Sequence, residues 1–428
     1  MAGEGFGRSP TFVVGSERQR GTLDSLVRRE QHFDEAYQKN KPLCFNAKAF
    51  QKTHPVKARK GQSDADATLC SPMLVAIADG VSQIEEFGID ASELPNELLN
   101  NVEELAVSQL LPGQETDEYC GPITMMREAY EATESLGSTT VLTAIMDNST
   151  KIHGKLHPMI AVCSIGDCEI LILRRASDGY LQSVFHTEMQ RIDGNAQSPL
   201  QLARVDDSVD PDFDPSIAIE VIERGSAVHC VSAFEGDIVI LGSDGVFDNL
   251  FIDEIVSLVQ GMLGSPDPAA KFKAVDRHRL GAIAKRLVLE AHAKTQVGPG
   301  GYRQSPIGPG GKIDDTSCVV AQVVEWTEAH GEAWAEVRQQ RGWRNLFTCG
   351  GQLPSCEDEV ITNDFDDIDD ETGTRQRNYP SKPNANSFST YWGSFSETRG
   401  GGPSRRPPPS LPSLREQRRE EYSGCQIM

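Results

Sequence analysis

Short apolar runs recur through the middle of the chain, each rich in Val, Ile, Leu or Thr and each bounded by turn residues. This pattern predicts β-strands. The predicted strands are Met73–Asp79, Thr139–Met146, Met159–Asp167, Glu169–Arg175, Asp237–Asp244 and Thr316–Trp326. The connection between the third and fourth runs is too short for a helical crossover, so we expect these two strands to pair antiparallel.

Longer segments lie between these runs and carry apolar residues at three- and four-residue spacing, which predicts amphipathic helices. The predicted helices are Glu93–Leu111, Pro122–Ser135, Ile252–Leu263 and Ala274–Ala293. A charged and aromatic stretch that ends near Phe347 is a further helical candidate. Clusters of strands together with clusters of helices indicate an α+β fold.

Composition divides the 428 residues into three parts. Residues 1–40 are polar and predict a flexible N-terminal segment, and residues 41–326 carry the strands and helices of one domain. Residues 327–428 form a charged tail, mostly rich in Gly, Pro, Ser and Arg, a composition that cannot bury a core. The acidic run 356–371 lacks the central Gly and closing Glu of a calcium loop, so we interpret it as solvated.

Charge and cysteine content exclude several classes of protein. The formal net charge of -22 argues against nucleic acid as a partner, because phosphate binding needs clustered Lys and Arg. The ten cysteines form no CxxC pair, which indicates neither a zinc site nor a disulfide framework and favours a reducing, cytoplasmic compartment. The sequence predicts no transmembrane helix and no secretory signal.

Aspartates stand at the ends of the predicted strands. Asp79 and Asp244 each follow a strand and precede a glycine, Asp167 lies between two strands, and Asp314 begins the segment before the last strand. Mg²⁺ and Mn²⁺ prefer oxygen ligands, so aspartates that converge would form a metal site. Asp-Gly pairs are also common turn formers. Spacing alone leaves both interpretations open.

Five motifs, taken in order, resemble the metal-dependent protein phosphatase family, the PPM or type 2C class, and most of all its mitochondrial and chloroplast branch. The motifs are DATLCSPMLVAIADGV, LGSTTVLTAIM, AVCSIGDCEILILR, GDIVILGSDGVFDNL and GKIDDTSCVVAQVV. The resemblance covers about Cys44 to Trp326. It implies two antiparallel β-sheets packed face to face and flanked by helices, an α-β-β-α sandwich.

The same resemblance implies a set of metal ligands. Asp79 would bridge two metal ions, and the carbonyl of Gly80 would contact one of them. Asp244 and Asp314 would complete the ligands of the other ion, and Asp167 resembles an acidic residue that binds a third ion in some members. The implied cofactors are therefore two Mg²⁺ or Mn²⁺ ions, with a third as a further candidate.

The implied reaction is hydrolysis of phosphoserine and phosphothreonine in phosphoprotein substrates by a metal-bound water. Asp66 matches the aspartate of the family's Glu-Asp-Ala element and is also a candidate metal ligand. Together with Asp79, Asp244 and Asp314 it forms the predicted catalytic set. Asp248 matches a family aspartate near the third ion.

Two departures from the family pattern keep other functions open. Ala65 stands where the family usually has a glutamate, for which Asp64 could substitute with a shift of one residue. The phosphate-gripping arginine is not at its expected spacing, and Arg59 is our candidate. The alternatives to an active phosphatase are a pseudophosphatase that only binds phosphoproteins and a metal-dependent hydrolase of small phosphate esters.

The final residues CQIM fit the C-a-a-X pattern, which predicts farnesylation of Cys425. One lipid chain gives only marginal membrane residence, and nearby arginines could add attraction to anionic lipids. We therefore expect a monomer in the cytoplasm, held reversibly at a membrane through its prenylated C-terminus. The family resemblance offers a mitochondrial or plastid location as the alternative.

Overall fold

The computed structural model describes residues 41–114, 116–191, 198–264 and 273–347, which belong to one compact unit. Side chains are described within the same ranges as far as residue 341. The predicted flexible segment 1–40, most of the predicted tail and the predicted prenylation site Cys425 lie outside the described residues.

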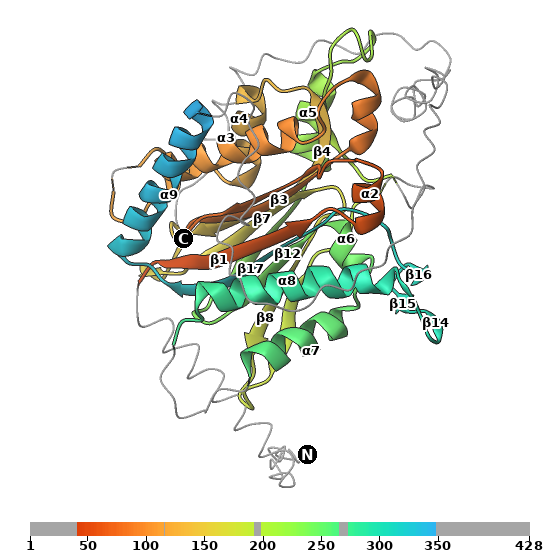
Figure 1. Ribbon diagram of the computed structural model, residues 1–428. Coiled ribbons are helices and arrows are strands. Elements are labelled where there is room, and N and C mark those ends of the chain that lie inside the picture. The colour runs from red at the N-terminus through yellow and green to blue at the C-terminus, as the bar shows by residue number, and fades with distance from the viewer. Residues whose placement is uncertain (1–40, 115, 192–197, 265–272, 348–428) are drawn as a thin grey trace, which may run out of the picture. The chain divides into compact units, whose positions relative to one another are not determined.

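Two antiparallel sheets form the centre of the structure (Figure 1). The first has the order β1-β17-β12-β8-β9, with bounds Leu43–Lys52, Thr316–Glu325, Ile238–Gly242, Glu169–Arg175 and Leu181–His186. The second has the order β11-β7-β4-β3-β2, with β10 beside β4; its bounds are Ala227–Ser232, Met159–Ile165, Gly137–Asp147, Leu74–Gly80, Asp66–Cys70 and Leu202–Arg204. The predicted α+β class is confirmed.

The expected pairing of β7 with β8 is wrong. β7 pairs with β4 and β11, whereas β8 pairs with β12 and β9 in the other sheet. The chain crosses between the sheets at Gly166, which has a φ of 105°. A Cβ atom there would come within 2.6 Å of the Thr140 side chain, so this sharp crossing requires glycine. The short connection therefore joins strands across the core and not within one sheet.

The central strands of the first sheet are apolar on both faces because they separate two hydrophobic cores. In β12, Val239 and Leu241 belong to the larger core, which contains residues of both sheets. Ile238 and Ile240 alternate with them and belong to a second core beneath α7 (Ile252–Leu263) and α8 (Arg277–Lys294). Alternation along an extended strand thus accounts for four consecutive buried apolar residues.

Helices cover the outer faces of both sheets (Figure 1). α3 (Glu93–Leu110) and α4 (Pro122–Ala132) pack on the second sheet, and α7 and α8 pack on the first. The helical stretch predicted near Phe347 is α9 (Glu328–Phe347). Trp334 of α9 is buried and donates its indole N–H to Glu103 of α3 at 2.7 Å, which attaches this helix to the sandwich.

Shorter elements connect these layers. The short helical turns are α2 (Pro55–Arg59), η1 (Ser82–Phe87), α5 (Ser216–Glu220), η2 (Val221–Gly225) and α6 (Asp244–Phe247). The small hairpins are β5 (Lys151–Ile152) with β6 (Lys155–Leu156), β13 (Val297–Gly298) with β14 (Gly301–Tyr302), and β15 (Gln304–Ser305) with β16 (Gly308–Pro309). None of the described helices is long and apolar enough to cross a membrane.

Candidate functional site

Four predicted aspartates approach one another where strands of the two sheets end. Asp66 begins β2 and lies directly opposite Asp79, near the end of β3. Asp244 follows β12 and begins α6, and Asp314 lies just before β17, which is the neighbour of β12. The hydroxyl of Ser317 in β17 donates to Asp66 Oδ2 at 2.5 Å and links the two sheets at this point.

Close backbone packing fixes Gly80, the residue after Asp79. Its N–H donates to the carbonyl of Ala65 at 3.2 Å. A Cβ atom at Gly80 would lie 2.5 Å from that oxygen and 2.4 Å from the carbonyl of Ala91. Only glycine fits at this position, so the Asp-Gly pair here is a packing requirement as well as a strand end.

The carboxyl groups of this site influence one another electrostatically. Burial raises the pKa of Asp66 well above its usual range, and the charge of Asp64 raises it further. Burial also raises the pKa of Asp79, and the charges of Asp66, Asp244 and Asp314 add to this effect. Asp66 Oδ1 and Asp244 Oδ1 are buried and have no hydrogen-bond partner within the described part of the chain.

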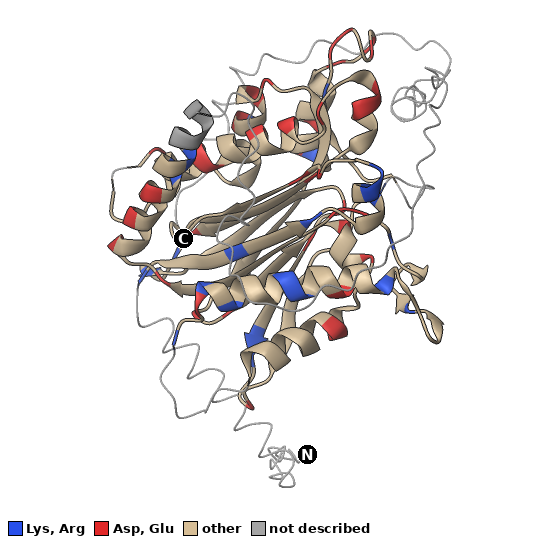
Figure 2. Ribbon diagram, in the orientation of Figure 1, with Lys and Arg blue, Asp and Glu red and all other residues tan. Residues whose placement is uncertain are grey.

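Two lysines neutralise part of this acidic group. The ammonium group of Lys312 contacts Asp244 Oδ2 and lies 2.9 Å from Asp314 Oδ2. Lys57 of α2 contacts Asp314 Oδ1 at 2.9 Å and Asp315 Oδ2 at 2.7 Å. Although burial tends to raise it, the pKa of Asp314 is held below its usual range by Lys312 and Lys57. Figure 2 shows the basic α2 beside acidic residues around α6.

A second acidic pair adjoins the first group. Asp167 lies at the crossing between β7 and β8. Burial and the charge of Asp244 raise its pKa to about 7, although the charges of Lys312 and Arg191 act to lower it. Arg191 Nη2 contacts both oxygens of Asp248, at 3.0 and 2.8 Å, and Arg191 Nε is 3.7 Å from Asp167 Oδ2. Arg191 is not among the residues predicted from the sequence, because only the fold brings it to these aspartates.

The structure does not place Arg59, our candidate for the phosphate-gripping residue, on these carboxylates. Its side chain is exposed and donates to the carbonyl of Pro55 at 3.2 Å. Lys57, two residues earlier, makes the acidic contacts instead. Ala65 is buried and supplies only its carbonyl. The neighbouring Asp64 accepts the N–H of Asp66 at 3.1 Å, and burial raises its pKa to about 6.

The donor set fits a hard divalent cation. Its side-chain donors are carboxylate oxygens, the type that Mg²⁺ and Mn²⁺ prefer, and two of these buried oxygens lack a partner. As the side chains stand, no three His, Cys, Asp or Glu residues of the described ranges surround one point closely enough to hold a metal ion. Lys312 and Lys57 supply positive charge at the positions where a bound cation would act.

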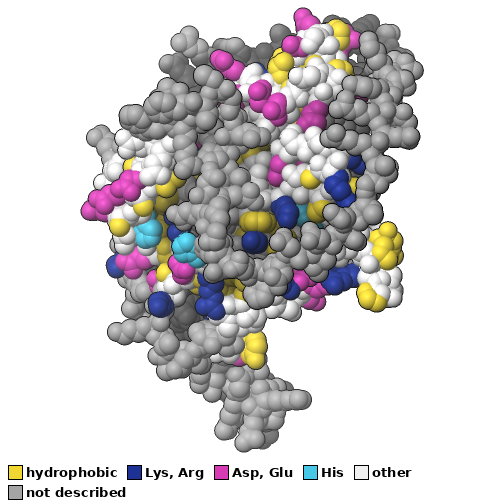
Figure 3. Space-filling view, in the orientation of Figure 1, with side chains coloured by type: hydrophobic (Ala, Val, Ile, Leu, Met, Phe, Trp, Pro, Cys, Tyr) yellow, Lys and Arg dark blue, Asp and Glu magenta, His cyan; other side chains and the backbone are white. Residues whose placement is uncertain are grey.

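The surface near this site is not uniformly acidic, despite the net charge of -22. Figure 3 shows basic side chains on the described surface around α2 and α8. The net negative charge of the chain is therefore not spread evenly over the described surface.

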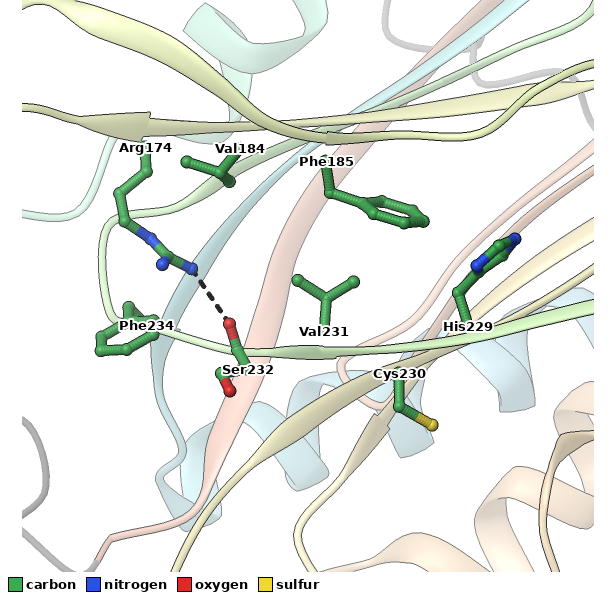
Figure 4. Close-up of a pocket in the computed structure, with 8 residues that line it drawn as sticks. All are labelled: Arg174, Val184, Phe185, His229, Cys230, Val231, Ser232 and Phe234. Atoms are coloured by element: carbon green, nitrogen blue, oxygen red, sulfur yellow. Dashed lines mark hydrogen bonds between the residues drawn. The ribbon is translucent and has the colours of Figure 1, made fainter.

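A separate cavity of about 430 Å³ lies between the edge strands β9 and β11 (Figure 4). Arg174 lines it, and its guanidinium group lies 3.9 Å from the centre of the Phe234 ring. Arg174 is paired with Asp237 through contacts of 2.7 Å from Nε and from Nη2. This cavity contains none of the predicted site residues, and its charge is already neutralised.

Three proteins illustrate what the chain resembles. It is 30% identical over 277 residues to probable protein phosphatase 2C 26 of Arabidopsis thaliana, covering 63% of this chain and 81% of that protein. It is 26% identical over 308 residues to probable protein phosphatase 2C 55 of the same plant, covering 71% of this chain and 58% of that one. The solved photosystem II phosphatase PBCP matches 65% of this chain and 98% of its own at 23% identity, with a TM-score of 0.46. No protein-family model matches.

Proposed function

This chain belongs to the protein phosphatase 2C family, and from that membership we propose that residues 41–326 form a metal-dependent protein serine/threonine phosphatase. The observation that carries the proposal is the group formed by Asp66, Asp79, Asp244 and Asp314, whose buried or half-buried carboxylates come from separate segments and repel one another. The proposed substrates are phosphoserine and phosphothreonine residues of phosphoproteins.

The charge balance of the site supports dependence on a metal. The aspartates in it are Asp64, Asp66, Asp79, Asp167, Asp244, Asp248, Asp314 and Asp315, and the basic residues that pair with them are Lys57, Arg191 and Lys312. Such an excess of carboxylates would repel the dianion of a phosphate ester. Additional positive charge would offset this repulsion and keep the carboxyl groups ionised, although their raised pKa values favour protonation.

We assign the metal ligands to Asp79, the Gly80 carbonyl, Asp244 and Asp314, with Asp66 beside them and Asp167 as the ligand of a third ion. When bound there, Mg²⁺ or Mn²⁺ would lower the pKa of a water molecule and offset the charge of the phosphoryl group. The chain itself supplies rigid placement, since Asp66 and Asp79 are paired across two strands and Ser317 holds Asp66. Arg191 and Lys57 supply fixed positive charge at the edges of the acidic group.

The test is hydrolysis of a phosphopeptide panel by the full chain after removal of metal with EDTA. We expect release of phosphate from phosphoserine and phosphothreonine peptides only when Mn²⁺ or Mg²⁺ is restored. A protein that binds phosphopeptides but hydrolyses none of them with either ion would be a pseudophosphatase. The alanine at position 65, where the family usually has a glutamate, would then explain the lost activity. Turnover of p-nitrophenyl phosphate without turnover of any peptide would support a hydrolase of small esters.

A further inference from the structure

Lys312 occupies a central position among the aspartates. Its ammonium group contacts Asp244 Oδ2 and lies 2.9 Å from Asp314 Oδ2, so it joins two carboxylates from different segments. Both of these aspartates are ligands of the proposed metal site. The charge of Lys312 also acts on Asp79 and Asp167. This one side chain therefore interacts with most of the acidic group.

The backbone of Lys312 is fixed by Asn249, which is buried. Lys312 donates its N–H to Asn249 Oδ1 at 2.8 Å, and Asn249 Nδ2 donates to the Lys312 carbonyl at 3.0 Å and to the Gly245 carbonyl at 2.8 Å. The preceding Gly311 has a φ of 58°, and a Cβ atom there would lie 1.9 Å from Asn249 Oδ1. Asn249 thus ties the lysine backbone to α6, the helix that Asp244 begins.

The side chain of Lys312 is less constrained than its backbone. It retains 35% of its exposed surface, against 4% for Asp244. The Asp314 side chain is also partly exposed, at 26%, so the Lys312–Asp314 side of this contact faces solvent while Asp244 stays buried. A lysine stem with several rotatable bonds can leave the aspartates without any movement of the Asn249 clamp.

We propose that Lys312 is an internal cation that occupies Asp244 and Asp314 in the metal-free protein, and that a divalent ion must displace its ammonium group to bind there. The proposal rests on the proposed metal-dependent function. The same carboxylate oxygen cannot serve an ammonium group and a metal ion at contact distance, because the two cations repel each other. Lys312 thus stabilises the empty site and lowers its affinity for metal.

The decisive variant is Lys312→Met, which keeps an unbranched apolar stem and removes the charge. The full chain is freed of metal, and binding of Mn²⁺ is followed by the electron paramagnetic resonance signal of the free ion. If the ammonium group occupies the carboxylates in about nine molecules of ten, its removal tightens Mn²⁺ binding roughly ten-fold. The matched control is Lys285→Met, which removes an exposed lysine that contacts the Phe50 ring and should leave the affinity unchanged.

Thermal unfolding gives a second readout of the same exchange. In EDTA, Lys312→Met should unfold at a lower temperature than the wild type, because Asp244 and Asp314 lose their counter-ion. In saturating Mn²⁺ this difference should disappear or reverse. If the variant does not fold, as judged by circular dichroism, Lys312→Gln carries the same expectations.

The outcomes separate this proposal from the proposed function. Equal or weaker Mn²⁺ binding by the charge-removed variant, beside clear binding by the wild type, overturns the role of Lys312 and leaves the metal site intact. Absence of Mn²⁺ binding in both the wild type and the variant overturns the metal site itself.

Discussion

Asp237 and Asp244 lie at the two ends of the same strand, β12, and both are almost completely buried, with exposures of 1% and 3%. Asp237 is fully paired: Arg174 contacts both of its oxygens at 2.7 Å, and the Phe234 N–H donates to it at 3.0 Å. Asp244 has one oxygen against Lys312 and a second without a partner in the described structure.

The two aspartates are similarly buried but differ in the charges that surround them, and this difference distinguishes a structural role from a functional one. Burial raises the pKa of both carboxyl groups, and a basic side chain opposes the effect in both cases. At Asp244, however, the charges of Asp314 and Asp248 act in the same direction as burial. Asp237 forms a complete ion pair with one arginine and so has a structural role. Asp244 is repelled by neighbouring carboxylates, and such a group is a candidate ligand for an added cation.

The largest effect is expected from Asp244→Asn. Loss of a charged metal ligand should lower phosphopeptide hydrolysis on the order of 1,000-fold. The metal-free variant should remain folded, because removal of one carboxylate relieves repulsion in the group. The measurements are Mn²⁺-dependent turnover and circular dichroism. Turnover at the wild-type rate would show that Asp244 does not bind the metal.

The same substitution at the other end of β12, Asp237→Asn, should have the opposite outcome. It leaves Arg174 beside a neutral group, and the free energy of unfolding should fall by about 3 kcal/mol. Turnover by the folded fraction should stay near that of the wild type, since the Arg174 cavity is separate from the acidic group. Urea denaturation and turnover at 25 °C test this pair of expectations. Lost activity with unchanged stability would show that Asp237 has a functional role and not a structural one.

A buried group whose charged neighbours are basic, and not acidic, extends the comparison to the effect of pH on stability. His292 in α8 contacts the Thr316 hydroxyl at 3.1 Å, and burial, with the charges of His54 and Lys52, lowers its pKa from 6.5 to about 4. Between these pH values the unfolded chain binds a proton that the folded chain does not. Stability should therefore fall as pH drops from about 6.5 towards 4, by up to about 1.4 kcal/mol per pH unit from this histidine.

The measurement for His292 is the free energy of unfolding in EDTA across that range, for the wild type and for His292→Gln. The variant should show the shallower dependence on pH, because its position no longer takes up a proton on unfolding. Identical slopes would mean that His292 does not carry this part of the acid sensitivity.

Local patterns in the sequence predicted much of the fold. Apolar runs bounded by turns identified β3, β4, β7, β8, β12 and β17, and three- and four-residue spacing identified α3, α4, α7 and α8. The edge strand β11 was missed because three of its six residues are exposed. The pairing of β7 with β8 was predicted wrongly, because the length of a connection limits how far the chain can travel and does not say which sheet it enters.

For the candidate site, the sequence predicted the acidic residues but not the basic ones. The strand-end aspartates could be found because each follows or precedes a clear apolar run. The basic residues were not found: Lys57 and Arg191 reach the aspartates through contacts between distant segments, and Lys312, although two residues from Asp314, reaches Asp244 only in the folded chain. Arg59 stays a prediction as the phosphate-gripping residue; on the same short helix, Lys57 and not Arg59 contacts Asp314.

The position of β17 has a consequence for how the protein is made. This strand lies between β1 and β12, and it pairs with β1 from Leu43 opposite Glu325 to Lys52 opposite Thr316. Until a ribosome has synthesised residue 325, β1 has no partner from this sheet, and contacts between such distant residues form slowly. Asp314 lies two residues before β17, so we expect its carboxylate to reach the other aspartates when this strand inserts. Closure of the sheet and completion of the acidic group should therefore occur together, late in folding.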